Sequence, residues 1–228
     1  MRTTTNEQRP TKPKIIAVTG AYRGIGFEIV RQLGHMGHTV IQTARNQDKA
    51  ELSAKSLTDL GYNIYSFPLD VLDIDNINDF YAFILANFGK LDILINNAAV
   101  LLPEDRNLLT IDPKLYQKTI STNAEAPLIL IKTLHELMTP GGRIINVSSS
   151  GGSMSDPIGG WSPAYCVAKS YLNAITRQLA YNLQEKGISV NAFDPGWVKS
   201  DMGGSSAPRT IRQGADTAVW LATADGRM

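Results

Sequence analysis

The 228-residue sequence contains few residues that would build a metal centre, a disulfide or a nucleic-acid surface. Cys166 is its one cysteine, which excludes an internal disulfide and a thiolate zinc cluster. The three histidines are scattered without metal-ligand spacing, so we expect no metal. Lys plus Arg (22) nearly balance Asp plus Glu (21), and no net field favours nucleic acid or an anionic membrane. A small-molecule ligand fits this composition best.

Long apolar runs are also missing. No run approaches the ~20 residues that a helix needs to cross a bilayer, and residues 1–13 lack the apolar core of a secretory signal. Together with the single cysteine, this predicts a cytoplasmic protein. The length and the 43% hydrophobic content favour one domain. We expect a disordered tail over residues 1–13 and a single catalytic domain over residues 14–228.

Apolar β-branched runs alternate with amphipathic stretches along the chain. The runs are nearly continuous in their apolar character, which is typical of parallel strands covered by helices on both faces. The pattern predicts a doubly wound, mostly parallel α/β sheet of the Rossmann kind. The expected strands are 14–19, 38–44, 63–68, 91–96, 143–148 and 188–193, and the expected helices are 24–37, 47–60, 75–88, 113–138, 162–186 and 211–222.

A glycine-rich turn directly follows the first expected strand and opens into a helix. Glycine allows the backbone to approach a pyrophosphate, and the helix N-terminus supplies N–H groups and a positive dipole end. This predicts that Gly20, Tyr22, Gly24, Ile25 and Gly26 cradle the phosphates of a dinucleotide. The spacing departs from the usual Gly-x-Gly-x-x-Gly, so a turn that merely joins strand and helix is the alternative.

The second expected strand ends in a basic residue. A site for NAD(H) would carry Asp or Glu here to accept hydrogen bonds from the ribose hydroxyls. Arg45 instead can pair with a 2′-phosphate, and Arg23 in the glycine turn can reach the same group. The alternative is that both are solvated surface cations. The two arginines together predict NADP(H) as the cofactor.

Tyr165 and Lys169 lie four residues apart in an expected helix, so both side chains share one face. A nearby ammonium stabilises a phenolate and lowers the pKa of the phenol, which would make Tyr165 a usable acid or base near neutrality. The spacing alone also arises by chance.

These residues together resemble the short-chain dehydrogenase/reductase family, in particular its carbonyl-reductase-like members. The likeness covers about residues 14–223. The matching motifs, in chain order, are Thr19-Gly20-x-x-x-Gly24-x-Gly26, Asp70-Val71, Asn96-Asn97-Ala98-Ala99, Asn123, Ser148-Ser149, Tyr165-x-x-x-Lys169 and Pro195-Gly196.

The resemblance implies roles for the cofactor-binding positions. Asp70 and Val71 would hold the adenine, although Asp70 has the alternative of capping the following helix. The turn that Asn96 begins, with Asn97 and Ala98, would lie under the adenosine ribose. The nicotinamide end would be held by Pro195, Gly196, Val198, Ser200 and Lys169, beside Tyr165.

The resemblance also implies a catalytic set. Tyr165 would donate the proton, Ser149 would hydrogen-bond the substrate oxygen, and Asn123 would hold a water that links Lys169 to solvent. The spacing from Ser149 to Tyr165 is longer than is usual in the family, so we expect an insertion within residues 151–160. Ser148 and Ser150 therefore stay as alternatives to Ser149.

The expected activity is NADPH-dependent reduction of a small, hydrophobic aldehyde or ketone to the alcohol. The alternative is an NADP(H)-binding sensor or scaffold that is catalytically weak or inactive. The apolar faces of the two longest expected helices suit a homodimer and equally a monomer. Two departures from the family stand out: Ala99 replaces a common glycine, and the usual seventh strand is expected to be missing at the C-terminus.

Overall fold

The computed structural model describes residues 12–156 and 158–224. Residues 1–11, most of the expected N-terminal tail, lie outside the described residues. The same holds for residues 225–228, at the chain end where the seventh strand is expected to be missing.

The centre of the molecule is a six-stranded sheet in the order β3-β2-β1-β4-β5-β6, in which every neighbouring pair is parallel. This confirms the predicted doubly wound α/β architecture. The strands are β1 (Ile15–Val18), β2 (Thr39–Ala44), β3 (Ile64–Pro68), β4 (Leu91–Asn96), β5 (Met138–Val147) and β6 (Ser189–Phe193).

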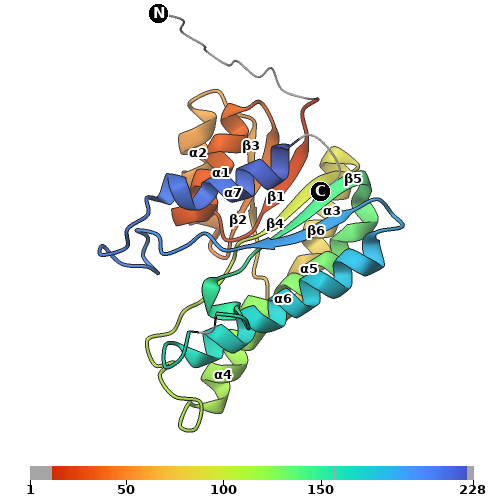
Figure 1. The fold of residues 1–228 in the computed structure, drawn as a ribbon. Coiled ribbons are helices and arrows are strands. Elements are labelled where there is room, and N and C mark those ends of the chain that lie inside the picture. Colours follow the sequence, from red (N-terminus) through yellow and green to blue (C-terminus); the bar gives the residue numbers. More distant parts are fainter. Residues whose placement is uncertain (1–11, 157, 225–228) are drawn as a thin grey trace, which may run out of the picture.

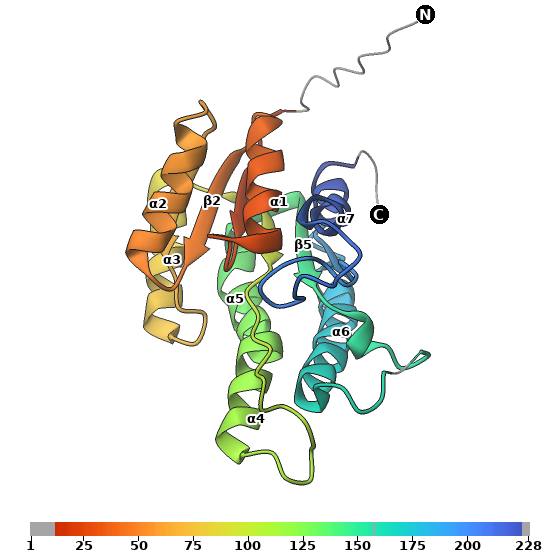
Figure 2. The same ribbon diagram turned by 90° about the vertical axis from the view of Figure 1, so that its left-hand side faces the viewer.

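Helices cover both faces of this sheet (Figures 1 and 2). One face carries α1 (Gly24–His35), α2 (Gln47–Thr58) and α7 (Ile211–Thr223). The other face carries α3 (Ile74–Phe88), α5 (Ala126–Leu134) and α6 (Pro163–Leu183). The preceding α4 (Pro113–Ile120) extends beyond the sheet (Figure 1).

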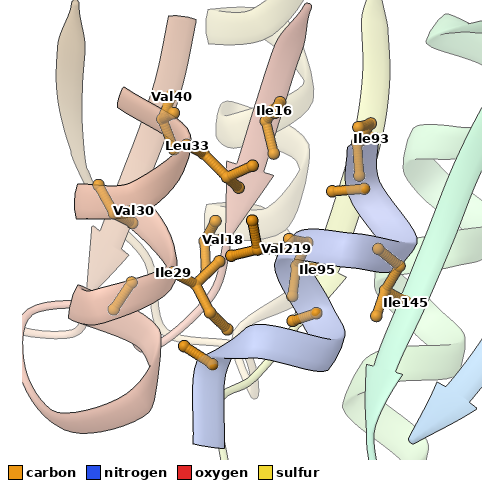
Figure 3. Packing of buried hydrophobic residues seen from close by; sticks show 14 of the residues in the cluster. Ile16, Val18, Ile29, Val30, Leu33, Val40, Ile93, Ile95, Ile145 and Val219 are labelled. Atoms are coloured by element: carbon orange, nitrogen blue, oxygen red, sulfur yellow. The ribbon is translucent and has the colours of Figure 1, made fainter. Parts of the chain in front are cut away.

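Two apolar layers hold the helices on the sheet, because successive strand residues point to opposite faces. In β1, Ile16 and Val18 pack toward Ile29 of α1 and Val219 of α7, as Figure 3 shows. Ala17 faces the opposite layer, which contains side chains of α3, α5 and α6. Burial on both sides explains why the strands read as continuous apolar runs.

The prediction of one continuous helix over residues 113–138 is wrong. The structure divides this stretch into α4, a π-helix (Ser121–Glu125), α5 and a 3-10 turn (His135–Leu137). Pro127 has no N–H and cannot donate to the carbonyl of Asn123 four residues earlier. At the start of α5, Ala126 N–H bonds Ser121 O, five residues back, as in a π-helix.

The strand expected over residues 143–148 begins earlier, at Met138, and ends at Val147. Met138 pairs with Leu91, and the register then shifts before Arg143 pairs with Ile93. The sequence Pro140-Gly141-Gly142 signals a turn, which hid this first part of the strand. The irregularity in the ladder accommodates the extra residues.

Within the part of the chain that the structure describes, no helix combines the length and the apolar character needed to span a bilayer. The same residues contain no cluster of three or more His, Cys, Asp or Glu side chains that could hold a metal ion.

Candidate active site

A cleft crosses the edge of the sheet at which all six parallel strands end. It receives side chains from the carboxyl end of each strand, as is usual for ligand sites in open α/β sheets. The predicted residues that line it are Gly20, Tyr22, Arg23, Gly24, Ile25, Gly26, Arg45, Asp70, Val71, Asn97, Ala98, Tyr165, Lys169, Pro195 and Ser200. The predicted residues that do not line it are Asn123, Ser149, Gly196 and Val198.

The glycine turn is fastened to the end of β4. Thr19 Oγ1 accepts hydrogen bonds from the backbone N–H groups of Asn97 and Ala98, both at 3.0 Å. Asn97 Nδ2 in turn donates to the carbonyl oxygens of Thr19 and Gly20. A Cβ atom at Gly26 would lie 2.4 Å from Asn97 Nδ2, so only glycine fits this packing.

The N-terminus of α1 points at the cleft without a side-chain cap. Its N-cap residue is Arg23, which is extended and makes no capping hydrogen bond, and the first turn contains no acidic residue. An uncapped N-terminus presents backbone N–H groups and a positive dipole end. The turn is therefore built to accept the phosphates of a dinucleotide.

The two predicted phosphate-binding arginines differ in their surroundings. Arg45 is exposed at the end of β2 and makes no hydrogen bond or ion pair with any residue that the structure describes. Arg23 pairs with Asp201, from the segment after β6, and its guanidinium lies 5.1 Å from the centroid of the Tyr22 ring. Arg45 is thus the arginine left available for a 2′-phosphate.

Asp70 lines the cleft and is not the cap of the following helix. The N-cap of α3 is Asp73, whose carboxylate accepts from Asp75 N and Asn76 N. Asp70 instead holds its own turn, with Oδ1 accepting from Leu72 N at 3.0 Å. The helix-capping role that was the alternative for Asp70 therefore belongs to Asp73.

Tyr165 is buried in the wall of the cleft, in the first turn of α6. Burial raises the pKa of its phenol to about 12, the Asp194 carboxylate adds to the rise, and the hydrogen bond with Ser149 opposes it. The lowered pKa expected from Lys169 is therefore not found. Desolvation is the largest cause of the shift, and the Lys169 ammonium, 5.5 Å from the ring centroid, does not reverse it.

Lys169 is buried one turn further along α6, and its Nζ donates to the carbonyl oxygen of Val147 at 2.7 Å. Loss of water around the ammonium lowers the pKa of Lys169 to about 8. The lysine is therefore a cation at neutral pH, although its charge is costly to keep in this site.

The three candidate serines at the end of β5 have different partners. Ser148 Oγ donates to Asn173 Oδ1 at 2.6 Å, and Ser150 is exposed. Ser149 lies within hydrogen-bonding reach of Tyr165. The 3-10 turn after it (Ser150–Gly152) is pressed against α6, since a Cβ atom at Gly152 would lie 2.7 Å from the carbonyl carbon of Lys169. Of the three serines, Ser149 is the one that interacts with Tyr165, whereas Ser148 is the one that lines the cleft.

Asn123 lies in the π-helix, buried beside the turn that follows β4. Both ends of its side-chain amide bond Val100: Oδ1 accepts from Val100 N and Nδ2 donates to Val100 O, both at 2.8 Å. The main-chain carbonyl of Asn123 lacks its α-helical donor, because Pro127 stands four residues later. A water held by Asn123 would therefore be bound by the backbone rather than by the amide.

The comparisons with known proteins agree with this geometry. The family model for short chain dehydrogenases matches residues 14–210. The chain belongs to the short chain dehydrogenase family.

Individual relatives extend the match beyond the family model. Carbonyl reductase (NADPH) 1 of Sus scrofa is 31% identical, over 92% of this chain and 86% of its own length. A 3-oxoacyl-acyl-carrier-protein reductase of Staphylococcus aureus is 32% identical, over 83% of this chain and 76% of its own. The crystal structure of a metagenomic short-chain oxidoreductase in complex with NADP has a TM-score of 0.79 and 30% identity, covering 93% and 91% of the two chains.

The family's common glycine at position 99 is not required in this chain. Among the described residues, Ser162 is the one non-glycine residue with a positive φ. Ala99 therefore has a backbone conformation that alanine adopts without strain.

The segment after β6 closes over one end of the cleft. Val198 and Arg209 form an isolated bridge, and Arg209 N donates to the carbonyl of Trp197, so the two ends of the intervening loop are joined. Ser200 Oγ accepts from Gly203 N at 3.2 Å. Val198 is buried and does not line the cleft.

A second hollow adjoins the cleft and shares Asp201 and Met202 with it. The rest of its wall combines apolar side chains, Leu101, Leu102 and Pro103 after β4 and Trp161 before α6, with the polar residues Asp105, Arg106 and Ser162. Trp161 is the aromatic residue of this wall, whereas the Trp197 indole donates to Gly203 O and Met154 is exposed. The apolar side chains of this mixed hollow, next to Tyr165, are suited to the apolar part of a substrate.

Several residues of the site were missed in the sequence. Thr19 belongs to the glycine motif, but the motif does not predict that its hydroxyl joins the glycine turn to the residues after β4. Asp105 and Asp201 lie in loops with no periodic signal. A spacing rule had no means of finding them, because each contacts a partner more than fifty residues away.

Lys169→Met tests the burial of the ammonium through the pH dependence of stability. The unfolded lysine keeps a pKa near 10.5 and the folded one has a pKa of about 8, so the unfolded chain binds more protons between these values. The free energy of unfolding of the wild type should therefore rise by about 3 kcal/mol relative to Lys169→Met as pH rises from 8 to 10.5. Urea unfolding at several pH values measures this difference.

The exposed Lys186 near the end of α6 provides the control. Lys186→Met should track the wild type at every pH. A difference between the wild type and Lys169→Met that stays constant from pH 7.5 to 10.5 would show that the ammonium is not desolvated.

Proposed function

We propose that this protein reduces a small hydrophobic aldehyde or ketone to the alcohol, using NADPH as the hydride donor and Tyr165 as the proton donor. The observation that carries the proposal is the buried pair of Tyr165 and Lys169, with Ser149 next to Tyr165, beside a cleft that also contains the glycine turn. A binding protein has no need of this proton-transfer set.

Three features support NADP(H) as the cofactor. Carbonyl reductase (NADPH) 1 of Sus scrofa carries it in its name, and the metagenomic oxidoreductase was solved with NADP. The glycine turn and the uncapped N-terminus of α1 fit a pyrophosphate. The free cation of Arg45 at the end of β2 fits a 2′-phosphate, where a carboxylate would suit NAD(H). When bound, NADPH supplies the hydride that adds to the carbonyl carbon.

Residues of the chain would donate the proton and stabilise the negative charge that develops on the substrate oxygen. With its raised pKa, Tyr165 is fully protonated at neutral pH and is ready to act as an acid. Ser149 would donate to the substrate oxygen as negative charge forms there. When Tyr165 gives up its proton, the nearby Lys169 cation would offset part of the cost of a buried phenolate. Asn123 would hold a relay water through its main-chain carbonyl.

The apolar side chains of Leu101, Leu102, Pro103 and Trp161 in the second hollow support a carbonyl compound with a hydrophobic part as the substrate. Trp161 packs edge-on against Tyr165, with ring centroids 5.7 Å apart. The indole therefore excludes water from one side of the phenol while it bounds the substrate space.

Tyr165→Phe tests the function. The substitution removes the hydroxyl and keeps the ring packing, so we expect kcat for aldehydes and ketones to fall about 100-fold or more, within the range of general acid catalysis. NADPH binding should change less than about threefold. Turnover is followed by NADPH oxidation with a panel of apolar carbonyl compounds, and binding by NADPH fluorescence.

Tyr171→Phe on the exposed side of α6 is the matched control and should leave kcat unchanged. Turnover that survives in Tyr165→Phe would contradict the mechanism. NADPH binding by the wild type without turnover of any carbonyl compound would indicate a sensor or scaffold instead.

Arg45→Asp tests the cofactor. It removes the cation for the 2′-phosphate and adds a carboxylate that accepts from ribose hydroxyls, so NADPH affinity should fall about tenfold or more while NADH affinity holds or rises. The same change at the exposed Arg177 of α6 controls for net charge. Equal losses for both cofactors would show that Arg45 does not contact the 2′-phosphate.

A further inference from the structure

The helix that carries Tyr165 begins without a cap of its own. Its N-cap residue Ser162 has φ 38° and ψ 62°, a left-handed conformation, and its side chain makes no capping hydrogen bond. Pro163 follows and has no N–H. The next two N–H groups, of Ala164 and Tyr165, have no intrahelical acceptor at such a position.

Asp105 satisfies both of these groups from another part of the chain. Its Oδ1 accepts from Ala164 N and its Oδ2 from Tyr165 N, both at 2.9 Å. The residue is only 3% exposed. Cys166 N bonds Ser162 O, so the first turn of α6 is fully hydrogen-bonded. A buried carboxylate with two short N–H donors at a helix N-terminus is strongly held by charge-assisted bonds and by the helix dipole.

Asp105 also belongs to the loop that lines the second hollow. Its backbone N–H bonds Leu102 O in a turn, and it lines the hollow together with Pro103 and Trp161. The single side chain therefore joins the wall that follows β4 to the start of α6. The backbone of Tyr165 is fixed directly by this bond rather than through neighbouring side chains.

We infer that Asp105 is a positioning residue for Tyr165, which it holds at the distance and angle needed for proton transfer to a carbonyl compound in the hollow. This inference rests on the proposed function. Displacing the proton donor by about 1 Å from its substrate lowers the rate of proton transfer strongly. Asp105 is not among the described residues that line the cofactor cleft. Loss of Asp105 should therefore lower kcat and leave cofactor affinity in place.

Asp105→Asn and Asp105→Ala test the inference against Asp112→Asn. Asn keeps the shape and one acceptor oxygen, whereas Ala keeps neither. Asp112 is the control, because it also caps a helix, with one oxygen, Oδ1, accepting from Lys114 N at 2.7 Å and Leu115 N at 3.3 Å, and it lies on the same connection between β4 and α5. Each variant removes a capping carboxylate, but only the Asp105 variants change the acceptors of Ala164 N and Tyr165 N.

We expect kcat to fall at least tenfold in Asp105→Asn and further in Asp105→Ala, with the Kd for NADPH within twofold of the wild type. Asp112→Asn should keep kcat within twofold. Rates are measured below the unfolding transition of each variant. Wild-type kcat in Asp105→Asn, or an equal loss in Asp112→Asn, would overturn the positioning role.

Amide hydrogen exchange separates this inference from the proposed function. Exchange at the Tyr165 amide should rise at least tenfold in the Asp105 variants and stay unchanged in Asp112→Asn. If the wild type reduces no carbonyl compound, the proposed function fails. The exchange rate at the Tyr165 amide still shows whether Asp105 holds Tyr165. Unchanged exchange at Tyr165 would overturn the inference regardless of any activity.

Discussion

The parallel pairing of β4 between β1 and β5 is the constraint on which the site depends. It brings the glycine turn, the Asn97 turn and the serines after β5 to one edge of the sheet. A buried chain of side chains extends this order to α6: Asn96 Nδ2 donates to Asn146 Oδ1, and Asn146 Nδ2 donates to Thr176 Oγ1. The helix of Tyr165 is thereby fixed to the same strands as the cofactor cleft.

Burial then sets the chemistry of the paired side chains. Tyr165 and Lys169 both lie in a dry wall, so desolvation moves the pKa of the phenol up and that of the ammonium down. Each shift favours the neutral form of its group. When Tyr165 loses its proton, neighbouring groups must stabilise the buried phenolate. Ser149 and Lys169 are the neighbours placed to do so.

Strand ends and motif residues could be predicted from the sequence, because apolar runs and glycine spacing are local signals. Arg45 follows from its place after β2 in the same way. The π-helix around Asn123 could not, since its i→i+5 bonds leave the apolar periodicity of a long helix almost intact and depend on Pro127. The direction of the Tyr165 shift depends on burial, and the bond from Asp105 spans sixty residues. Neither has a local pattern.

The central claim is that NADPH lies along the strand ends, with its 2′-phosphate at Arg45 and its reactive ring beside Tyr165. A crystal structure of the wild-type protein with NADPH tests this most directly. The account predicts the pyrophosphate at the N-terminus of α1, the 2′-phosphate within hydrogen-bonding distance of Arg45, and the nicotinamide next to Tyr165 and Lys169. A nicotinamide bound away from Tyr165, or a 2′-phosphate that Arg45 does not contact, would contradict it.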